Sequence, residues 1–307
     1  MAQHHFMIEL AVNPSFDDPL DVAEVADHVA VVEGVGAHLD LGNSVVAVRV
    51  LADAVVVEQA MAVAEVDALG DGIHEVILPT RMPTAVLLSG GLDSAVLLAE
   101  ETACGDTQPI YVSVGLAWER AEQEATRRFL ESERMAGRAR PLVSLSVDMS
   151  DVYPATHWAL RGSAPGYHTP DEDVYLPGRN IVLLGKAAVF CAAAGIERLA
   201  IGTLDHNPFP DATPAFRAAF ASVLSLGLGH RLDIVAPYAR VGKAEVIRRG
   251  VAAGVPLELT LSCMNPTDGP APRHCGLCSK CRERHEAFIE AGVEDRTDYA
   301  SDRFIGA

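Results

Sequence analysis

The sequence lacks any apolar run of about eighteen residues, the length that marks a candidate membrane-spanning helix. Its first ten residues, MAQHHFMIEL, lack both the basic region and the apolar core of a secretory signal peptide. These two absences predict a chain that enters no membrane and is not exported. The cytoplasm is therefore the expected location.

Positive charge is also scarce. The chain has 24 Lys and Arg against 42 Asp and Glu, a formal net charge of −18. Because binding to a nucleic-acid backbone draws on clustered Lys and Arg, the expected partner is a small molecule or a protein rather than nucleic acid. An acidic composition also serves solubility alone, and this simpler interpretation stays open.

A third absence concerns residues 86–94, VLLSGGLDS. An apolar run leads into Ser89, Gly90 and Gly91, and a helix-forming stretch follows, which predicts a strand, a glycine turn and a helix start. The backbone N–H groups of such a turn, the positive end of the helix and the hydroxyls of Ser89 and Ser94 suit a phosphate group. The Walker pattern G-x-x-x-x-G-K-[ST] is missing, because no lysine follows the second glycine. The alternative is an ordinary strand-to-helix turn.

The chain has 307 residues, 49% of them hydrophobic, so it can bury a sizeable core and has room for two domains. Residues 1–80 contain short β-branched runs between turn signals, which predict a small β-rich N-terminal module: FMIELAV, HVAVVE, SVVAVRVL and IHEVILPT. From Thr84 onward the strand-like stretches TAVLL, PIYVSVG, PLVSLSV and RLAIG alternate with helical ones. This alternation is typical of an α/β fold with a parallel, doubly wound sheet, whose ligands bind at the carboxyl ends of the strands.

Four of the six cysteines crowd near the C-terminus, in the pattern Cys263-x11-Cys275-x2-Cys278-x2-Cys281. Three thiols within seven residues are poorly suited to pairing with one another as disulfides, so a metal site is the favoured interpretation. Four thiolates can close a tetrahedral, structural zinc site, although an iron–sulfur cluster uses the same ligands. Four unrelated buried thiols are the less favoured alternative. The two remaining cysteines are expected to be small core residues; they are Cys104 and Cys191.

Together, and in this order, the SGGLDS loop, the PGRN stretch (177–180) and the four cysteines resemble the N-type ATP pyrophosphatases. With IVAPYARVGKAEVIRRG, LTLSCMN and HCGLCSKCRERHEAF, the chain is similar, over about residues 84–295, to the 7-cyano-7-deazaguanine synthase (QueC-like) family. The resemblance implies an adenine nucleotide alpha hydrolase-like PP-loop domain over residues 81–307, with a zinc-binding segment at 263–281. Residues 1–80 lie outside it.

The resemblance implies an AMP-forming C–N ligase of queuosine biosynthesis that uses ATP, Mg²⁺ and Zn²⁺. In this family ATP adenylates the carboxylate of 7-carboxy-7-deazaguanine and releases pyrophosphate. Ammonia then displaces AMP to give an amide, and a second ATP-dependent step dehydrates the amide to the nitrile. A loop that holds departing β- and γ-phosphates does not transfer a γ-phosphoryl group, which accounts for the missing Walker lysine.

The resemblance also implies roles for individual residues. Asp93 would place Mg²⁺ or orient the loop, Arg179 would neutralise phosphate charge, and Lys243 would contact phosphate, so these three are the predicted catalytic residues. The simpler alternatives are a helix-capping carboxylate for Asp93, a solvated charge for Arg179 and an exposed amphipathic-helix lysine for Lys243. The predicted nucleotide-binding residues are Leu88, Ser89, Gly90, Gly91, Leu92, Asp93, Ser94, Arg179 and Asn180.

On the substrate side the sequence departs from the family pattern Y-P-D-C-R. Phe209 and Asp211 keep the aromatic and acidic positions, but Ala212 and Thr213 replace the Cys and Arg. An aromatic side chain at Phe209 can stack on a flat deazapurine, and a carboxylate at Asp205 or Asp211 can accept the N–H donors of a guanine-like edge. The alternative is a stiff, proline-rich turn. ATP use is therefore better supported than the identity of the substrate.

Three rival interpretations stay open. A related ligase would deliver the adenylated deazaguanine acyl group to an amine other than ammonia, such as one on a protein. The other two are a tRNA-thiolating PP-loop enzyme and a zinc-stabilised nucleotide-binding module without catalysis. Residues 1–80 fit a docking surface for a protein partner, a dimerisation element that makes a homodimer, or a lid.

Overall fold

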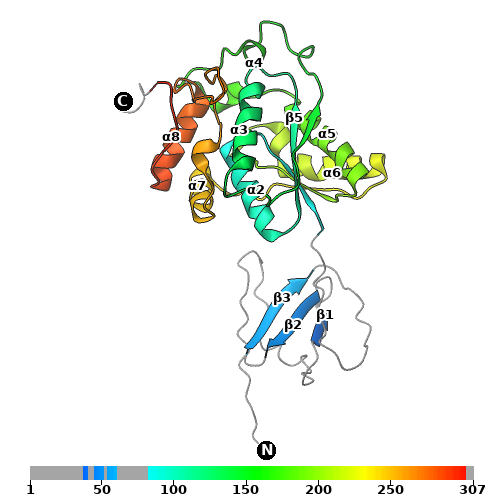
Figure 1. The fold of residues 1–307 in the computed structure, drawn as a ribbon. Helices are drawn as coiled ribbons and strands as arrows, with labels where there is room; N and C mark the ends of the chain where they lie inside the picture. The colour runs from blue at the N-terminus through cyan, green and yellow to red at the C-terminus, as the bar shows by residue number, and fades with distance from the viewer. Residues whose placement is uncertain (1–36, 41–44, 52–53, 61–81, 302–307) are drawn as a thin grey trace, which may run out of the picture. The chain divides into compact units, whose positions relative to one another are not determined.

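The computed structural model describes residues 37–40, 45–51, 54–60 and 82–301 (Figure 1). The chain separates into two compact units, Met1–Thr80 and Arg81–Ala307. The roles assigned to these two parts from the sequence stay predictions.

In the first unit the described elements are three antiparallel strands in the order β1-β2-β3. Their bounds are Ala37–Asp40 for β1, Val45–Leu51 for β2 and Ala54–Ala60 for β3. β2 coincides with the predicted run SVVAVRVL, and both β2 and β3 are rich in valine, which suits a pleated strand. The predicted runs FMIELAV, HVAVVE and IHEVILPT lie outside the described residues.

The second unit is built on a five-stranded sheet in the order β6-β5-β4-β7-β8, in which every neighbouring pair is parallel. The strands are β4 (Thr84–Leu87), β5 (Thr107–Ser113), β6 (Val143–Ser146), β7 (Arg198–Ala200) and β8 (Asp233–Val235). This confirms the predicted parallel α/β fold. The three-residue β8 adds an edge strand that the sequence analysis did not identify.

The strands differ in burial according to their place in the sheet. All four residues of the central strand β4 are buried, as expected where helices cover both faces. The edge strand β6, VSLS, instead alternates between half-buried and exposed residues. The continuous apolar run of β4 and the alternation of β6 therefore reflect central and edge positions.

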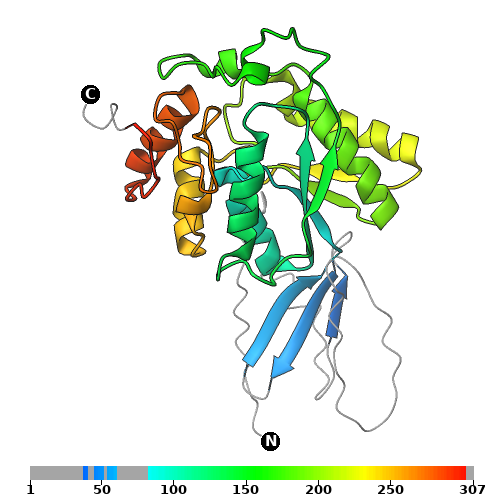
Figure 2. The same cartoon turned by 45° about the horizontal axis from the view of Figure 1, so that its top comes forward.

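Helices cover both faces of the sheet, which confirms the doubly wound arrangement (Figures 1 and 2). One core cluster joins the strands to α5 and α6, and a second joins them to α2, α7 and α8. None of the helices in the described part of the chain combines the length and apolar character that a bilayer crossing requires. The helices are α2 (Leu92–Cys104), α3 (Glu119–Glu131), α4 (Trp158–Arg161), α5 (Arg179–Ala194), α6 (Pro214–Leu228), α7 (Lys243–Ala252) and α8 (Ser279–Ala291), with short 3-10 turns η1 (Asp171–Val174), η2 (Pro210–Ala212) and η3 (Leu257–Leu259).

The glycine loop lies at the point where the strand order reverses. From β4 the chain first adds β5 and β6 on one side and then β7 and β8 on the other. The loop that follows β4 therefore leaves the sheet at the carboxyl edge beside this reversal, where open α/β sheets bind their ligands. Gly202, just after β7, packs here: a Cβ on it would lie 3.3 Å from the backbone of Asp93 and Ser94. This approach is closer than most Cβ contacts, so it favours glycine.

Candidate active site and cysteine cluster

The glycine loop is held together by its own two serines. The Ser89 and Ser94 hydroxyl oxygens lie 3.3 Å apart, and the Ser94 hydroxyl donates to the Gly91 carbonyl at 3.0 Å. The N–H of Gly91 donates to Ser89 Oγ at 3.3 Å. Helix α2 begins directly after Gly91, which has no side chain to cap it, and the hydrogen bonds among the described residues include none between Asp93 and the helix backbone. The structure therefore does not support the alternative that Asp93 is a capping residue, and the helix end stays available to an anion.

Neighbouring elements pack closely against the glycine loop at Gly90. This residue has a φ of +75°, and a Cβ on it would lie 2.7 Å from the Glu122 carbonyl oxygen and 2.8 Å from Thr126 Oγ1. Only glycine fits between the loop and α3 in this conformation. On the other side, the N–H of Leu261 donates to the Gly90 carbonyl at 2.8 Å.

Lys243, the first residue of α7, lies between two carboxylates. Its Nζ is 3.2 Å from Asp93 Oδ2 and 2.5 Å from Glu283 Oε1, and its side chain is only 13% exposed. Although burial alone would lower the pKa of Lys243, Asp93 and Glu283 together raise it above its usual value. The lysine is therefore a buried, protonated group, and the interpretation as an exposed amphipathic-helix residue is wrong.

The two carboxylates around Lys243 differ. Burial raises the pKa of Asp93, with Lys243 opposing the shift. Burial would also raise the pKa of Glu283, but the charges of Lys243 and Lys280 lower it to about 2. Asp93 Oδ1 is buried and makes no hydrogen bond within the described part of the chain. The site therefore contains an unused carboxylate oxygen next to the glycine loop.

Arg179 begins helix α5 directly after Gly178, whose φ of +78° turns the chain into the helix. Its Nε is buried and makes no hydrogen bond to any described residue. A buried donor without a partner costs free energy, so this guanidinium is a candidate to bind a ligand.

Glu122 of α3 is a buried carboxylate near Arg179 that the sequence analysis missed. It accepts hydrogen bonds from Tyr111 Oη at 3.0 Å and from Trp118 Nε1 at 2.9 Å. Burial raises its pKa to about 7, against the opposing charge of Arg179. The sequence pattern could have predicted that Glu122 is buried, because helical spacing places it on the same face of α3 as the buried Ala125 and Phe129.

Asp211 caps helix α5. Its Oδ2 accepts the backbone N–H of Asn180 at 3.1 Å, and its Oδ1 lies 3.2 Å from Asn180 Nδ2. Burial raises the pKa of this carboxyl, which the hydrogen bonds from Asn180 oppose. The structure thus links the PGRN and FPDAT stretches, and it gives Asp211 and Asn180 a structural contact besides their predicted substrate and nucleotide roles.

The other two predicted substrate residues lie in different surroundings. Phe209 is half-buried, and its ring stacks on that of Tyr175 with centroids 5.0 Å apart. Asp205 is exposed and accepts the backbone N–H of His206 at 2.8 Å. Thr213, in the position of the family arginine, caps α6 by accepting the N–H of Phe216, and Ala212 is buried. The FPDAT segment is therefore packed into the protein and is more than a surface turn.

The four C-terminal cysteines form a buried cluster. Their sulfur atoms all lie within 4.8 Å of one another, and the closest separations are 3.5 Å and 3.9 Å. Four sulfurs about 2.3 Å from a tetrahedral metal ion would be separated by ~3.8 Å, so the spacing fits one ion. Backbone N–H groups, including that of Asn265, also point at the sulfurs. The cluster can hold a metal, and the interpretation as four unrelated thiols is wrong. The four are Cys263, Cys275, Cys278 and Cys281.

The two remaining cysteines have different environments. Cys191 is fully buried in α5, as predicted. The same prediction is wrong for Cys104, which is exposed. The reason is its position, because Cys104 is the last residue of α2 and the helix ends there, at Gly105.

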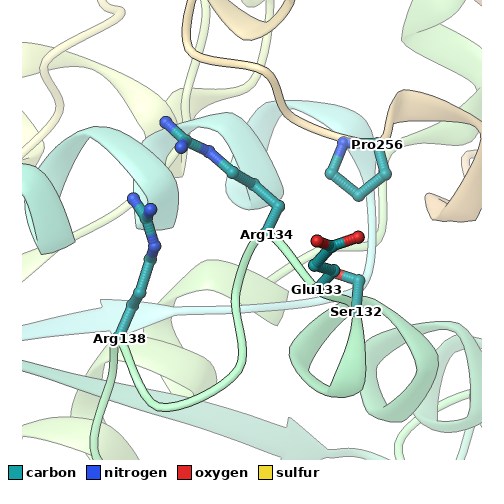
Figure 3. A pocket seen from close by; sticks show the side chains of 5 residues that line it. All are labelled: Ser132, Glu133, Arg134, Arg138 and Pro256. Carbon is teal, nitrogen blue, oxygen red and sulfur yellow. The ribbon is translucent and has the colours of Figure 1, made fainter.

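A pocket of about 450 Å³ lies away from these residues, between the end of α3 and Pro256 (Figure 3). Figure 3 labels the side chains that line this pocket, among them Arg134 and Arg138, with Glu133 and Ser132 drawn below Pro256. None of the predicted site residues lines it. The pocket and the predicted site are therefore different places.

Comparisons with known proteins agree with the resemblance seen in the sequence. The family described as "Queuosine biosynthesis protein QueC" matches residues 84–292. A 7-cyano-7-deazaguanine synthase of Anaeromyxobacter dehalogenans (strain 2CP-C) is 36% identical over 225 residues, 70% of this chain and 94% of that protein. A 7-cyano-7-deazaguanine synthase of Azoarcus sp. (strain BH72) is 36% identical over 232 residues, 72% of this chain and 98% of that protein.

One solved structure shows a weaker likeness. It comes from Methanocaldococcus jannaschii DSM and is described as a predicted subunit of a tRNA methyltransferase. It has a TM-score of 0.34 at 16% identity and covers 64% of this chain and 97% of that one. A likeness of this size carries no argument about function.

Proposed function

The chain belongs to the queuosine biosynthesis protein QueC family, and from this premise we propose that it is an ATP-dependent 7-cyano-7-deazaguanine synthase. The observation that carries the proposal is a pair of buried polar atoms, Asp93 Oδ1 and Arg179 Nε, which lie on two of the predicted catalytic residues and make no hydrogen bond to any described residue. Unsatisfied buried groups of this kind are rare unless a ligand completes them.

The proposed reaction begins with adenylation. A carboxylate oxygen of 7-carboxy-7-deazaguanine attacks the α-phosphorus of ATP, and the bond to the β-phosphate oxygen breaks, which releases pyrophosphate. The glycine loop holds the departing pyrophosphate through its backbone N–H groups and the uncapped start of α2. Adenylation is useful because AMP is a better leaving group than a carboxylate oxygen. Ammonia then attacks the acyl carbon, and AMP leaves to give the amide. A second ATP-dependent step removes water to give the nitrile.

Charged side chains around the loop fit this chemistry. Arg179 would pair with phosphate oxygens through its Nε, which makes no hydrogen bond to a described residue and lies near the buried Glu122. Lys243 would supply a permanent positive charge, because Asp93 and Glu283 keep it protonated. Asp93 Oδ1 is a suitable ligand for Mg²⁺, which would neutralise phosphate charge when bound.

The cysteine cluster fits a structural zinc ion. A single tetrahedral ion matches the observed sulfur separations, whereas a multi-iron cluster would hold the sulfurs farther apart because the thiolates bind different irons. Four cysteine ligands leave no open coordination position, so the ion would supply stability and no Lewis-acid step.

The stacked rings of Tyr175 and Phe209 would offer a flat apolar surface to the deazaguanine ring. The exposed Asp205 would accept its N–H donors.

A second candidate function rests on the FPDAT segment. Thr213 caps α6 and Ala212 is buried, so neither side chain takes the place of the arginine and the cysteine of the family pattern. The acceptor of the acyl group therefore has to be tested directly. The alternative is a ligase that transfers the adenylated deazaguanine acyl group to another amine, such as one on a protein. No observation in the structure favours a tRNA-thiolating enzyme or an inactive module over these two.

The test is incubation with ATP, Mg²⁺ and 7-carboxy-7-deazaguanine, with ammonia supplied or withheld. We expect AMP and pyrophosphate, and with ammonia a nitrile product detected by mass spectrometry. Release of ADP and phosphate instead would contradict the mechanism. Substrate-dependent AMP release with ammonia but no amide or nitrile would point to the alternative acceptor. Asp93→Asn is the inactive control.

A further inference from the structure

Helix α8 connects the cysteine cluster to the glycine loop. Cys278 is the residue directly before the helix, and Cys281 lies in its first turn. Two further residues of the helix, Glu283 and Arg284, contact Lys243 and the segment 257–262 instead of the sulfurs. We propose that α8 is a strut through which the cysteine cluster positions the glycine loop, with Glu283 and Arg284 as positioning residues.

The first route from α8 to the glycine loop, the charge route, is a chain of ionic contacts. Glu283 Oε1 is 2.5 Å from Lys243 Nζ, and the same Nζ is 3.2 Å from Asp93 Oδ2. All three side chains are at most 23% exposed, so solvent screens the chain of contacts weakly. Because Asp93 belongs to the loop's own helix, a shift of Glu283 changes the carboxylate predicted to face the nucleotide.

The second route, the Arg284 route, consists of hydrogen bonds to the chain segment that contacts Gly90. Arg284 is fully buried and donates to neutral oxygens on the segment 257–262: the Leu257 carbonyl at 2.8 Å, Thr260 Oγ1 at 2.9 Å and Ser262 Oγ at 3.2 Å. Leu261 lies inside this segment, and its N–H donates to the Gly90 carbonyl at 2.8 Å. The guanidinium therefore fixes the stretch of chain that clamps the glycine turn.

Both routes depend on the cluster. Cys263 directly follows the segment that Arg284 holds, while Cys278 and Cys281 fix the start of α8. A metal bound by these thiolates would tie the helix and the segment to one another at one point. Without that closure, the side-chain contacts of Arg284 and Glu283 alone would hold α8 in place, so the Gly90–Leu261 and Asp93–Lys243 contacts would weaken together.

The first experiment compares Glu283→Gln with Glu286→Gln by hydrogen exchange on the nucleotide-free, metal-containing protein. Glu286 is on the same helix but its side chain is 63% exposed, which makes it a matched control. We expect backbone amides in residues 88–98 to exchange about tenfold faster in Glu283→Gln and at the native rate in Glu286→Gln. Metal content measured by elemental analysis should be unchanged in both. Native exchange of this stretch in Glu283→Gln would overturn the charge route.

The second experiment removes the metal from the native protein with a chelator and follows the same amides. The strut predicts faster exchange in residues 88–98 and 257–264 together, with the central strand β5 unchanged. Faster exchange around the cysteines alone would overturn the proposal. Ser262→Ala, which removes one acceptor of Arg284, is a milder variant and should speed exchange of both stretches without metal loss. If both stretches exchange at the native rate in Ser262→Ala, the Arg284 route fails.

The proposal rests on the proposed function only for its kinetic consequence. In an active protein, Glu283→Gln should lower kcat for AMP formation by about tenfold while KM for ATP changes much less, because loop position matters most in the transition state. A KM effect without a kcat effect would contradict a positioning role. If the native protein forms no AMP at all, the function fails but the exchange measurements still decide the strut.

Discussion

The candidate site has two halves: the nucleotide half around the glycine loop and the substrate half around the FPDAT stretch (209–213). They hold their residues in different ways. Around the glycine loop, buried charges meet one another: Lys243 lies between Asp93 and Glu283, and Leu261 clamps Gly90. Around FPDAT, Asp211 caps α5, and Asp205 is exposed. The acidic residues of the two halves are therefore engaged differently, by a lysine side chain in one and by a helix N-terminus in the other.

The largest effect is expected from disrupting the cysteine cluster, which is proposed to support the nucleotide half. Cys278→Ala should abolish metal binding and lower the free energy of unfolding by on the order of several kcal/mol, since closing such a site contributes to folding. Metal analysis and thermal unfolding would measure both. Cys104→Ala, at an exposed position, is the control and should keep the metal and the native melting temperature. Unchanged metal content in Cys278→Ala would contradict the metal site.

The next effect tests whether the charges of the nucleotide half serve the reaction. Asp93→Asn keeps the shape of the side chain but removes its charge, so we expect AMP formation to fall by about 10²–10³ while the fold stays native. The measurement is pyrophosphate release, with circular dichroism for the fold. Glu131→Gln, on the exposed end of α3, is the control. A loss of fold in Asp93→Asn without nucleotide would instead show that Asp93 is mainly structural.

A third prediction addresses the substrate half. Asp211→Asn should destabilise the protein by about 1–2 kcal/mol, because it weakens the acceptor of the Asn180 N–H at the start of α5. Phe209→Leu should instead raise KM for the deazaguanine carboxylate with a smaller change in melting temperature. If Asp211→Asn melts like the native protein and only KM rises, its contact with Asn180 is secondary to substrate binding.

The last expected effect is a pH dependence of stability at Glu122, which lies near Arg179. Its pKa is raised from 4.5 to about 7, so the folded protein keeps a proton that the unfolded chain releases. Stability therefore falls as pH rises from about 4.5 to 7, and the loss is complete above that range. In Glu122→Gln this component should disappear. Melting temperatures at pH 5 and pH 8 would show a smaller difference in the variant, and an equal difference would mean that Arg179 keeps Glu122 ionised.

The prediction from sequence was most complete where the signal was local. The SGGLDS turn, each strand or helix pattern and the cysteine spacing are read from short stretches of chain, and the parallel sheet and the sulfur cluster confirm the predicted α/β fold and the grouping of the four cysteines. The three-residue β8 was missed because so short a strand shows no periodicity. Cys104 was misplaced because helical patterning does not tell where a helix ends.

The sequence by itself determined the fold class, the strand–glycine turn–helix pattern and the grouping of the four cysteines, because backbone preferences and residue spacing act over short stretches of chain. Only the tertiary structure decided that Glu122 lies near Arg179, that Asp211 caps α5 and that Lys243 lies between Asp93 and Glu283. The physical reason is that these partners come from elements far apart in sequence. Their charges and hydrogen bonds depend on burial that exists only once the sheet and helices have packed.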